Sequence, residues 1–458
     1  FAHKMGGVSG TVLLLMMAYV TSAEWKFDPS KTRMFDPSAS KSFAATTDSF
    51  HLKFADASEL HGYKAFEEVE LGEFRARVPV GILTDCNSPD FNGVDGIVGF
   101  GFPSPHPNYP PPLFWSLTNP SDKSSNALNI QRKFSFFSRD DRAELQLGGY
   151  DPDSVVGDMY FTRTVLRDHF QVAVTSVTYG PDKHSAVELM DFLEQRREGD
   201  TPEYIPATLD SGTTCFVMPD HDVGGMLGSS PYKRYLAHKK AGSKFWLMID
   251  GREYEIAHHT CVRGRSAPWM NHFLIGNAFF HTWLVQFDMT PPQPTIGFAK
   301  INPAYTPVTK LTTGSYTLEQ TPVHKLPVTS RQQTLSELPM MHQGALSHAS
   351  TEVDRLPTAN DGGVRYLLDL KMGTPPQKFT VILDTGSSVF GVFVKPKQKE
   401  QGQAVELEQS ASVQEPSHIA SLPLALVVLV MYVGVLGVVL VRRRRRPERS
   451  LASQASTH

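Results

Sequence analysis

The chain has 458 residues, of which 40% are hydrophobic and 20% are charged, and its formal net charge at pH 7 is -3. This is the composition of an ordinary globular protein. It lacks the excess of Lys and Arg that nucleic-acid binding needs, so nucleic acid is excluded as an expected partner. The 34 Gly and 33 Pro residues punctuate short apolar runs, which favours a mostly β fold with few, short helices.

The N-terminal segment has the pattern of a secretory signal peptide. An apolar run, Thr11–Val20, is followed by small residues that end at Ala23, and such residues are typical of a cleavage site. We therefore expect residues 1–23 to be a signal peptide. Because the sequence begins with Phe1, either Met5 is the true start or the N-terminus is incomplete.

Short strand-like runs follow from Lys26 to about Asn302. They are rich in β-branched and aromatic residues and are separated by turn residues, which predicts strands. The runs are Phe50–Phe54, Glu67–Leu71, Ala76–Leu83, Phe134–Ser138, Ala143–Gly149, Phe170–Gly180, Phe245–Ile256, Trp283–Asp288 and Thr295–Ala299. One segment in this region, Ala186–Arg197, is predicted to form a helix.

The C-terminal part changes character several times. Residues 303–360 are polar and show little periodicity, so we expect a long and largely irregular linker. Strand patterns return over 361–396, and a charged, Gln-rich stalk follows at 397–418. Residues 419–441 are apolar and uncharged for 23 residues, long enough for one transmembrane helix. The five Arg that follow predict a cytoplasmic tail at 442–458 and a single-pass type I arrangement.

Three cysteines are too few for a fold held together by disulfides. We expect a bridge between Cys215 and Cys261, which leaves Cys86 unpaired unless it bonds another chain. The sequence His258–Cys261 contains metal-binding residue types, but no second group of ligands supports a metal site. We therefore expect neither a metal nor a cofactor.

One chemical motif occurs twice. Asp384 follows an apolar strand and precedes Thr-Gly-Ser-Ser, and Asp210 follows Leu209 and precedes Ser-Gly-Thr-Thr. A single Asp-Thr/Ser-Gly is a weak signal, because a short match arises by chance and an Asp there can simply cap a turn. Two copies with matched flanks are much stronger, and they make Asp210 and Asp384 the candidate catalytic residues.

The residue types suit general acid-base chemistry. A Gly after the Asp lets the backbone turn tightly, which places the carboxylate at the floor of a cleft. Two carboxylates that lie within about 3 Å of each other cannot both ionise and share a proton. One can then activate a water molecule while the other polarises a carbonyl group. The neighbours expected to shape the two loops and to bond the carboxylates are Ser211, Gly212, Thr213, Thr385, Gly386 and Ser387.

A second feature is also duplicated. The segments Gly93–Gly101 and His272–Phe280 each carry a Gly after apolar residues, at Gly99 and Gly276. Such strands can pack beside the Asp loops at a distance that no side chain would permit.

These motifs resemble the pepsin-like aspartic protease family, and the resemblance covers nearly all of the chain before the stalk. It implies a bilobal all-β fold, an extended peptide bound across a cleft, and hydrolysis by water at acidic pH. The membrane anchor, together with the absence of a Trp after the first Asp motif, resembles the membrane-anchored beta-secretase branch.

The sequence departs from the family pattern at three positions. The family's flap hairpin carries a Tyr, whereas Phe54 stands there in this chain. The phenolic hydroxyl that would bond towards the active site is therefore lost. Gly391 replaces a frequent Trp, and Asn277 replaces a frequent Asp.

The order of the motifs is rotated relative to the family, because the Asp384 loop comes last instead of first. The chain can be a circular permutation, in which residues 361–396 complete the lobe that begins at residue 24. It can also be a fragment of a tandem protein or a misordered gene product. Permutation is physically reasonable, because a linker of this length spans a domain easily.

We therefore expect an all-β, bilobal pepsin-like fold in permuted order, plus one C-terminal transmembrane helix. The lobes are 24–157, completed by 361–396, and 158–302. The expected activity is that of an aspartic endopeptidase, with the rival of a peptide-binding pseudoprotease. The expected partners are a peptide or protein substrate and the membrane of the secretory or endosomal pathway or of the cell surface. The oligomeric state stays open, since the long linker also permits exchange between chains.

Overall fold

The computed structural model describes residues 27–395 with internal gaps, and all of these residues belong to one compact unit, Phe1–Lys397. The gaps are 55–57, 73, 119–129, 140–141, 168, 193–202, 224–229, 257–260, 266–270, 291, 311, 316–321, 333–351 and 354–363. The expected signal peptide, stalk, transmembrane helix and tail lie outside the described residues. Among the helices that are described, none has the length and apolar character needed to cross a membrane.

The described residues form two β-sheets. The larger has 15 strands, in the order β20-β1-β2-β3-β23-β4-β22-β21-β19-β6-β5-β16-β17-β7, with β18 paired to β19. Its strands are Ala44–Phe54 (β1), Glu59–Leu71 (β2), Phe74–Cys86 (β3), Gly96–Gly99 (β4), Lys133–Arg139 (β5), Arg142–Leu147 (β6), Val155–Arg163 (β7), Trp283–Asp288 (β16), Thr295–Ile301 (β17), Thr312–Ser315 (β18), Pro322–Gln332 (β19), Glu352–Val353 (β20), Val364–Met372 (β21), Gln377–Asp384 (β22) and Phe390–Phe393 (β23).

The smaller sheet has eight strands, in the order β13-β12-β8-β10-β15-β11-β14, with β9 paired to β8. Its strands are Gln171–Gly180 (β8), Val187–Asp191 (β9), Ile205–Leu209 (β10), Phe216–Pro219 (β11), Lys244–Ile249 (β12), Arg252–Ile256 (β13), Val262–Arg265 (β14) and Phe273–Ile275 (β15). The α-helices in the described part of the chain are short: Leu113–Leu117 (α2), Pro231–His238 (α3) and Asn277–Phe280 (α4). The fold is therefore mostly β, as the composition predicted.

The strand predictions are confirmed wherever apolar residues alternate. In β2 the buried and less buried positions alternate along nearly the whole strand, as expected for a strand with one face on the core. The run Phe245–Ile256 divides into β12 and β13, which turn at Asp250 and Gly251. Both turn residues have positive φ, and Asp-Gly is the residue pair that favours this two-residue turn.

The helix predicted over Ala186–Arg197 is wrong where the segment is described. Val187–Asp191 is strand β9, which pairs antiparallel with β8, and residues 193–197 of the segment lie outside the described residues. The reason is tertiary: Leu189 and Met190 are buried, and the neighbouring strand supplies hydrogen-bond partners that outweigh the weak local preference for a helix.

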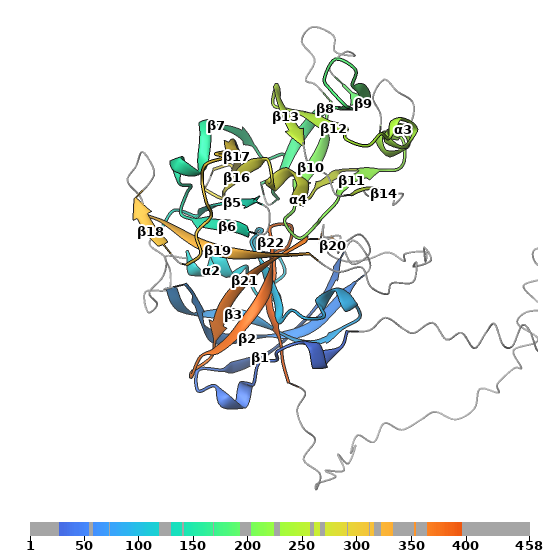
Figure 1. Cartoon of the computed structure of the whole chain (residues 1–458). Coiled ribbons are helices and arrows are strands. Elements are labelled where there is room, and N and C mark those ends of the chain that lie inside the picture. The colour runs from blue at the N-terminus through green and yellow to red at the C-terminus, as the bar shows by residue number, and fades with distance from the viewer. Residues whose placement is uncertain are drawn as a thin grey trace, which may run out of the picture. The chain divides into compact units, whose positions relative to one another are not determined.

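The expectation of a largely irregular linker over 303–360 is wrong for part of that segment. Strand β19 lies between β6 and β21 in the larger sheet. In Figure 1, β19 and the orange strands β21 and β22 run between the blue strands β1–β3 and the strands β5 and β6. Nζ of Lys325 on β19 lies 2.9 Å from Oδ2 of Asp151, and both side chains are almost completely buried.

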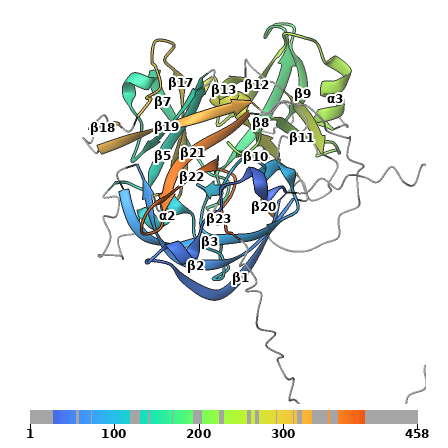
Figure 2. The ribbon, with the colours of Figure 1, turned by 60° about the horizontal axis from the view of Figure 1, so that its bottom comes forward.

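The C-terminal strands pack among the N-terminal ones. β22 pairs parallel with β4, and β23 pairs parallel with β3 and antiparallel with β4. Figure 2 shows β23 above the curved strands β1–β3. Beyond β23, the N–H of Phe35 donates to the carbonyl of Phe393 at 2.7 Å, and the N–H of Lys395 donates to the carbonyl of Phe35 at 3.0 Å. Phe35 and Val394, which are about 360 positions apart, thus form an isolated parallel β-bridge.

Candidate active site

Asp210 and Asp384 occupy equivalent places in two copies of one strand arrangement. Asp384 ends β22, which runs parallel to β4, and Asp210 follows β10, which runs parallel to β15. In each copy, the strand after the Asp loop pairs antiparallel with the same neighbour, β23 with β4 and β11 with β15. The repeated motif in the sequence therefore corresponds to repeated local structure.

Four hydrogen bonds join the two loops. The N–H of Ser211 donates to Oγ1 of Thr385 at 2.9 Å, and the N–H of Thr385 donates to Oγ of Ser211 at 3.0 Å. The two hydroxyls in turn donate across the site, Ser211 to the carbonyl of Leu383 at 3.0 Å and Thr385 to that of Leu209 at 2.9 Å. We expected these hydroxyls to bond the carboxylates, but they fix one loop to the other instead.

Each carboxylate also accepts a hydrogen bond from its own loop. The N–H of Gly212 donates to Oδ1 of Asp210 at 2.7 Å, and the N–H of Gly386 donates to Oδ1 of Asp384 at 2.9 Å. The hydroxyl of Thr213 donates to the second oxygen of Asp210. These bonds hold the plane of each carboxylate, because both oxygens of Asp210 and one of Asp384 have a fixed donor.

The loop of Asp384 differs at the residue equivalent to Thr213. Oγ of Ser387 is buried and has no hydrogen-bond partner among the described residues, although we expected it to bond a carboxylate. The carbonyl of Ser387 accepts from the N–H of Gly101 at 2.9 Å. Ser387 thus fixes the loop to the segment after β4 through its main chain.

Both carboxyl groups are fully buried, with no exposed surface on either residue. Asp384 is close enough to Asp210 to act on its carboxyl group both through its charge and through a side-chain hydrogen bond. Burial, and then the nearby charge of Asp384, raise the pKa of Asp210 well above its usual value of 3.8. Desolvation and a like charge both disfavour a second ionisation, so the pair holds one proton where an isolated Asp would have lost it.

The glycines of the two loops lie against the opposite carboxylates. A Cβ atom on Gly212 would lie 2.6 Å from Oδ1 of Asp384, and one on Gly386 would lie 2.6 Å from Cγ of Asp210. No side chain fits at either position without moving a carboxylate. The Gly of the repeated motif is therefore required by space as well as by the turn.

The two glycines in the neighbouring strands are close to the loops, as predicted. A Cβ on Gly99 would lie 2.5 Å from the carbonyl oxygen of Ser387, and one on Gly276 would lie 2.3 Å from that of Thr213. Cys215, just after the Asp210 loop, forms the predicted disulfide with Cys261, while Cys86 is buried. Both Asp loops thus pack against the neighbouring glycine-bearing segments through close main-chain contacts.

The hairpin expected to form the flap consists of β1 and β2, whose connection at 55–57 lies outside the described residues. Phe54 is the last residue of β1. Its side chain is buried, and its ring centroid lies 6.1 Å from that of Phe91, a core residue. The aromatic ring at the Tyr position therefore packs into the lobe.

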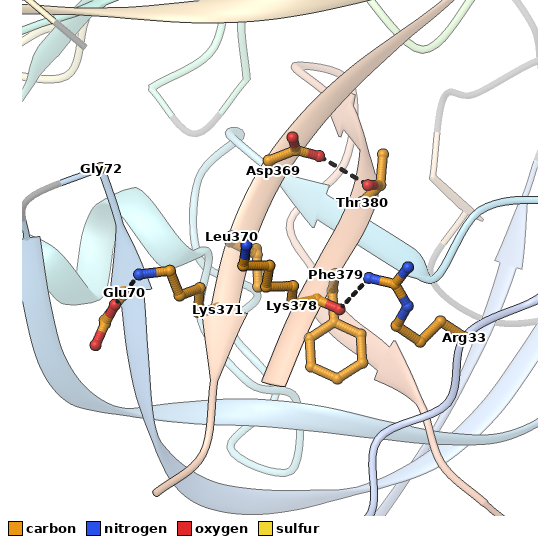
Figure 3. A pocket seen from close by; sticks show the side chains of 9 residues that line it. All are labelled: Arg33, Glu70, Gly72, Asp369, Leu370, Lys371, Lys378, Phe379 and Thr380. Atoms are coloured by element: carbon orange, nitrogen blue, oxygen red, sulfur yellow. Dashed lines mark hydrogen bonds and ion pairs between the residues drawn. The ribbon is translucent and has the colours of Figure 1, made fainter. Parts of the chain in front are cut away.

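A pocket of about 340 Å³ lies elsewhere, on the hairpin of β21 and β22 (Figure 3). Neither Asp210 nor Asp384 lines it. Its polar groups bond one another: Nζ of Lys371 lies 2.8 Å from Oε2 of Glu70, and Arg33 donates to the carbonyl of Lys378 at 2.9 Å. The lining of this pocket thus does not include the pair of carboxylates.

The sequence alone did not indicate the hydrogen bonds between the loops. The available signal was that a hydroxyl residue follows the Asp in both copies, at Ser211 and Thr385. Two hydroxyls related by a local repeat can each donate to and accept from the other loop, so their equivalence was a usable sign of reciprocal bonding.

Comparison with known proteins agrees with this geometry. A family model described as eukaryotic aspartyl protease matches residues 18–301 and 365–420. Aspartic protease 3 of Toxoplasma gondii is 25% identical to the chain over 215 residues, which are 44% of this chain and 30% of that protein. The chain therefore matches less than a third of the length of this relative.

Proposed function

The chain belongs to the eukaryotic aspartyl protease family, and we propose that it is an endopeptidase whose catalytic dyad is Asp210 and Asp384. The observation that carries this proposal is the set of four hydrogen bonds between the two Asp loops. They hold the two buried carboxyl groups side by side. Groups that act together on one bond need such fixed placement.

In the proposed reaction, the two carboxyl groups divide the acid and base roles. Asp210, whose pKa is raised by burial and by the nearby charge, keeps its proton and polarises the carbonyl of the scissile peptide bond. Asp384 accepts a proton from the attacking water. The proton then passes to the leaving amine, as aspartic proteases in general are understood to work. This assignment implies an acidic optimum, because the dyad must keep one proton.

The loop residues have positioning roles in this proposal. Ser211 and Thr385 keep the loops in register, and Gly212 and Gly386 orient the carboxylates through their N–H groups. Thr213 holds the second oxygen of Asp210. Ser387 supports its loop through the main chain.

A second candidate function is peptide binding without cleavage. The observation in its favour is Phe54, which has no hydroxyl and packs towards Phe91 instead of presenting a polar group at the flap. A pseudoprotease of this kind would still bind peptides but would not cleave them at a measurable rate. Cleavage assays on the folded protein discriminate between the two functions.

The test is peptide cleavage between about pH 3 and 7 by the wild type and by Asp210→Asn and Asp384→Asn. We expect acid-dependent cleavage that each variant reduces by roughly 10²-fold to 10⁴-fold, the usual contribution of a general acid or base. Thr46→Ala, which removes a hydroxyl on β1 outside the active site, is the control. Undiminished cleavage by either Asn variant would refute the dyad. Absence of cleavage by folded wild type would favour the binding protein.

We further propose that residues 361–396 complete the lobe of their own chain and that the apolar run 419–441 anchors the protein as a type I membrane protein. The first point is supported by the pairing of β22 and β23 with β3 and β4. The second is supported by the 23 uncharged residues and the Arg run after them. Carbonate extraction of membranes tests the anchor, since removal of 419–458 should release the protein.

A further inference from the structure

Three side chains on the hairpin of β1 and β2 lie close enough together to bind one metal ion. His51 on β1 is the direct cross-strand partner of His61 on β2, and their rings stack with centroids 4.2 Å apart. Glu59 lies two residues before His61 in β2 and therefore on the same face of the sheet. The hairpin thus places two imidazoles and a carboxylate together.

The distances between the potential ligand atoms suit a small tetrahedral ion. Oε2 of Glu59 lies 3.4 Å from Nε2 of His51 and 3.9 Å from Nε2 of His61. All three ligand atoms lie within 4.8 Å of one another. Zn²⁺ binds His nitrogen and Glu oxygen at about 2.0–2.2 Å, so two ligands of one tetrahedral ion lie about 3.4 Å apart. Side-chain rotations would bring the observed atoms to this spacing, and they must also tilt the two stacked rings, whose planes differ by 6°, so that both nitrogens point at the ion.

The environment leaves one carboxylate oxygen and one side of the site open. Nζ of Lys53 lies 3.6 Å from Oε1 of Glu59, which leaves Oε2 facing the two imidazoles. The side chains of His51 and His61 are 41% and 45% exposed, and that of Glu59 is 29% exposed. A metal ion can therefore enter from solvent, and water can complete its coordination.

We propose that His51, Glu59 and His61 form a Zn²⁺ site that joins the two strands of the hairpin next to its tip at 55–57. The sequence predicted no metal, because His258–Cys261 has no second group of ligands and because ligands on two different strands form no local pattern. Because His51 and His61 belong to different strands, a bound ion restrains the hairpin as a cross-link does. If the protein is the protease proposed above and this hairpin is its flap, a bound Zn²⁺ also slows the entry of peptide.

The direct test is Zn²⁺ binding by the full-length chain at pH 7, where imidazoles are mostly neutral. Calorimetry is compared for the wild type, His51→Gln, His61→Gln and the control His184→Gln, which removes an exposed histidine outside the site. We expect each ligand variant to weaken one Zn²⁺ site by more than the roughly 10-fold to 100-fold that loss of an outer-shell partner costs. Binding that is absent in the wild type, or equal in the wild type and the ligand variants, would overturn the proposal.

Two further measurements, hydrogen exchange and peptide cleavage, test what bound Zn²⁺ does to the hairpin. Hydrogen exchange of the β1 and β2 amides should slow with Zn²⁺ in the wild type and in His184→Gln but not in His61→Gln; no slowing in the wild type would refute the cross-link. Neither calorimetry nor hydrogen exchange depends on peptide cleavage, so both remain informative if the protein is not a protease. If it is, Zn²⁺ should lower the cleavage rate of the wild type and leave that of His61→Gln unchanged. Equal inhibition of both would refute gating through this site.

Discussion

Thr385 occupies the same position in its loop as Ser211 does in the other, and each hydroxyl both accepts and donates a hydrogen bond across the site. Both residues are buried. Buried polar groups cannot form replacement hydrogen bonds with water. The loss of one hydroxyl therefore leaves one hydrogen-bond donor and one acceptor of the other loop unsatisfied. The mutual position of the two carboxyl groups therefore depends on residues that have almost no exposed surface.

We expect Thr385→Ala to destabilise the fold by roughly 1–3 kcal/mol and to lower kcat by up to about 10²-fold through misplacement of the carboxyl groups. KM should change little, because the Thr385 side chain is buried and offers almost no surface for contact with a peptide. Thr385→Ser keeps the hydroxyl and is the matched control. Urea unfolding and steady-state kinetics measure both effects, and an unchanged kcat in the Ala variant would contradict the positioning role.

The raised pKa of Asp210 makes stability depend on pH. Below its usual pKa of 3.8 the side chain is protonated in both the folded and the unfolded chain, and it contributes no pH dependence. Above 3.8 the unfolded chain ionises while the folded chain keeps the proton. The free energy of unfolding therefore falls as pH rises, until the raised pKa of the folded state is reached.

Asp210→Asn cannot ionise, so we expect it to be more stable than the wild type at pH 7 and equally stable at pH 3. Urea unfolding at both pH values measures the difference. Asp182→Asn is a control of opposite sign, because hydrogen bonds from Ser185 lower the pKa of Asp182; this variant should be less stable at pH 7. A stability difference for Asp210→Asn that does not change with pH would contradict the raised pKa.

At the scale of elements, β19 shows how a polar segment becomes part of a core. Lys325 and Asp151 form a buried ion pair at 2.9 Å, and the hydroxyl of Tyr305 donates to Oε1 of Glu144 at 2.8 Å beside it. Burial also raises the pKa of Glu144. The strand is thus attached to β6 by backbone pairing and to Asp151 by a buried ion pair.

We expect Lys325→Met to destabilise the protein by about 3–5 kcal/mol, because removal of one partner leaves a buried carboxylate without its counter-charge. Lys183→Met is the control, since Lys183 pairs with Glu253 on the surface and its loss should cost about 0–1 kcal/mol. Urea unfolding compares the two variants. Equal small effects would mean that β19 does not occupy this place in the sheet.

The same strand explains why part of the fold could not be predicted. Strands such as β2 bury alternate apolar residues, and their period is visible in the sequence. In β19, His324 and Lys325 are buried because partners distant in sequence neutralise or surround them, and no local pattern reveals such partners. Strand β9 was missed for a related reason, since its pairing with β8 overrode a helical pattern.

The candidate active site could likewise be predicted from the sequence only in part. Asp210 and Asp384 could be predicted, because the chemistry requires the residue types that the motif repeats. The side chains of Ser387 and Thr213 could not be distinguished from sequence, although only Thr213 bonds a carboxylate in the described structure. Which rotamer a hydroxyl adopts depends on the packing around it, and this is set by the whole fold.

At the scale of the whole molecule, the order of the strands in sequence differs from their order in space. The segment that carries Asp384 comes last, yet β22 and β23 lie among strands from the first hundred residues. The first described residues of the chain lie close to the residues that follow the Asp384 loop. The ring centroids of Phe27 and Phe393 are 4.3 Å apart, and Nζ of Lys395 lies 3.0 Å from Oδ2 of Asp36. Since native pairing depends on spatial neighbours, the chain order can change without changing the sheet.

A chain with restored order tests this directly. Residues 311–397 are placed first and joined by a flexible linker of about six residues to residues 26–310, which opens the chain after the exposed residue Lys310. We expect this protein to fold with the Cys215–Cys261 disulfide and to cleave the same peptides at the same acidic pH. Disulfide mapping, circular dichroism and cleavage assays compare it with the original chain.

The same rearrangement carrying Asp384→Asn is the control and should fold without cleaving. If the restored chain cleaves peptides and the original chain, although folded, does not, the Asp384 segment does not complete its own lobe in the original order. If both chains cleave with similar rates, the position of this segment in the sequence has little effect on the active site, because the sheet brings Asp384 to Asp210 from either end of the chain.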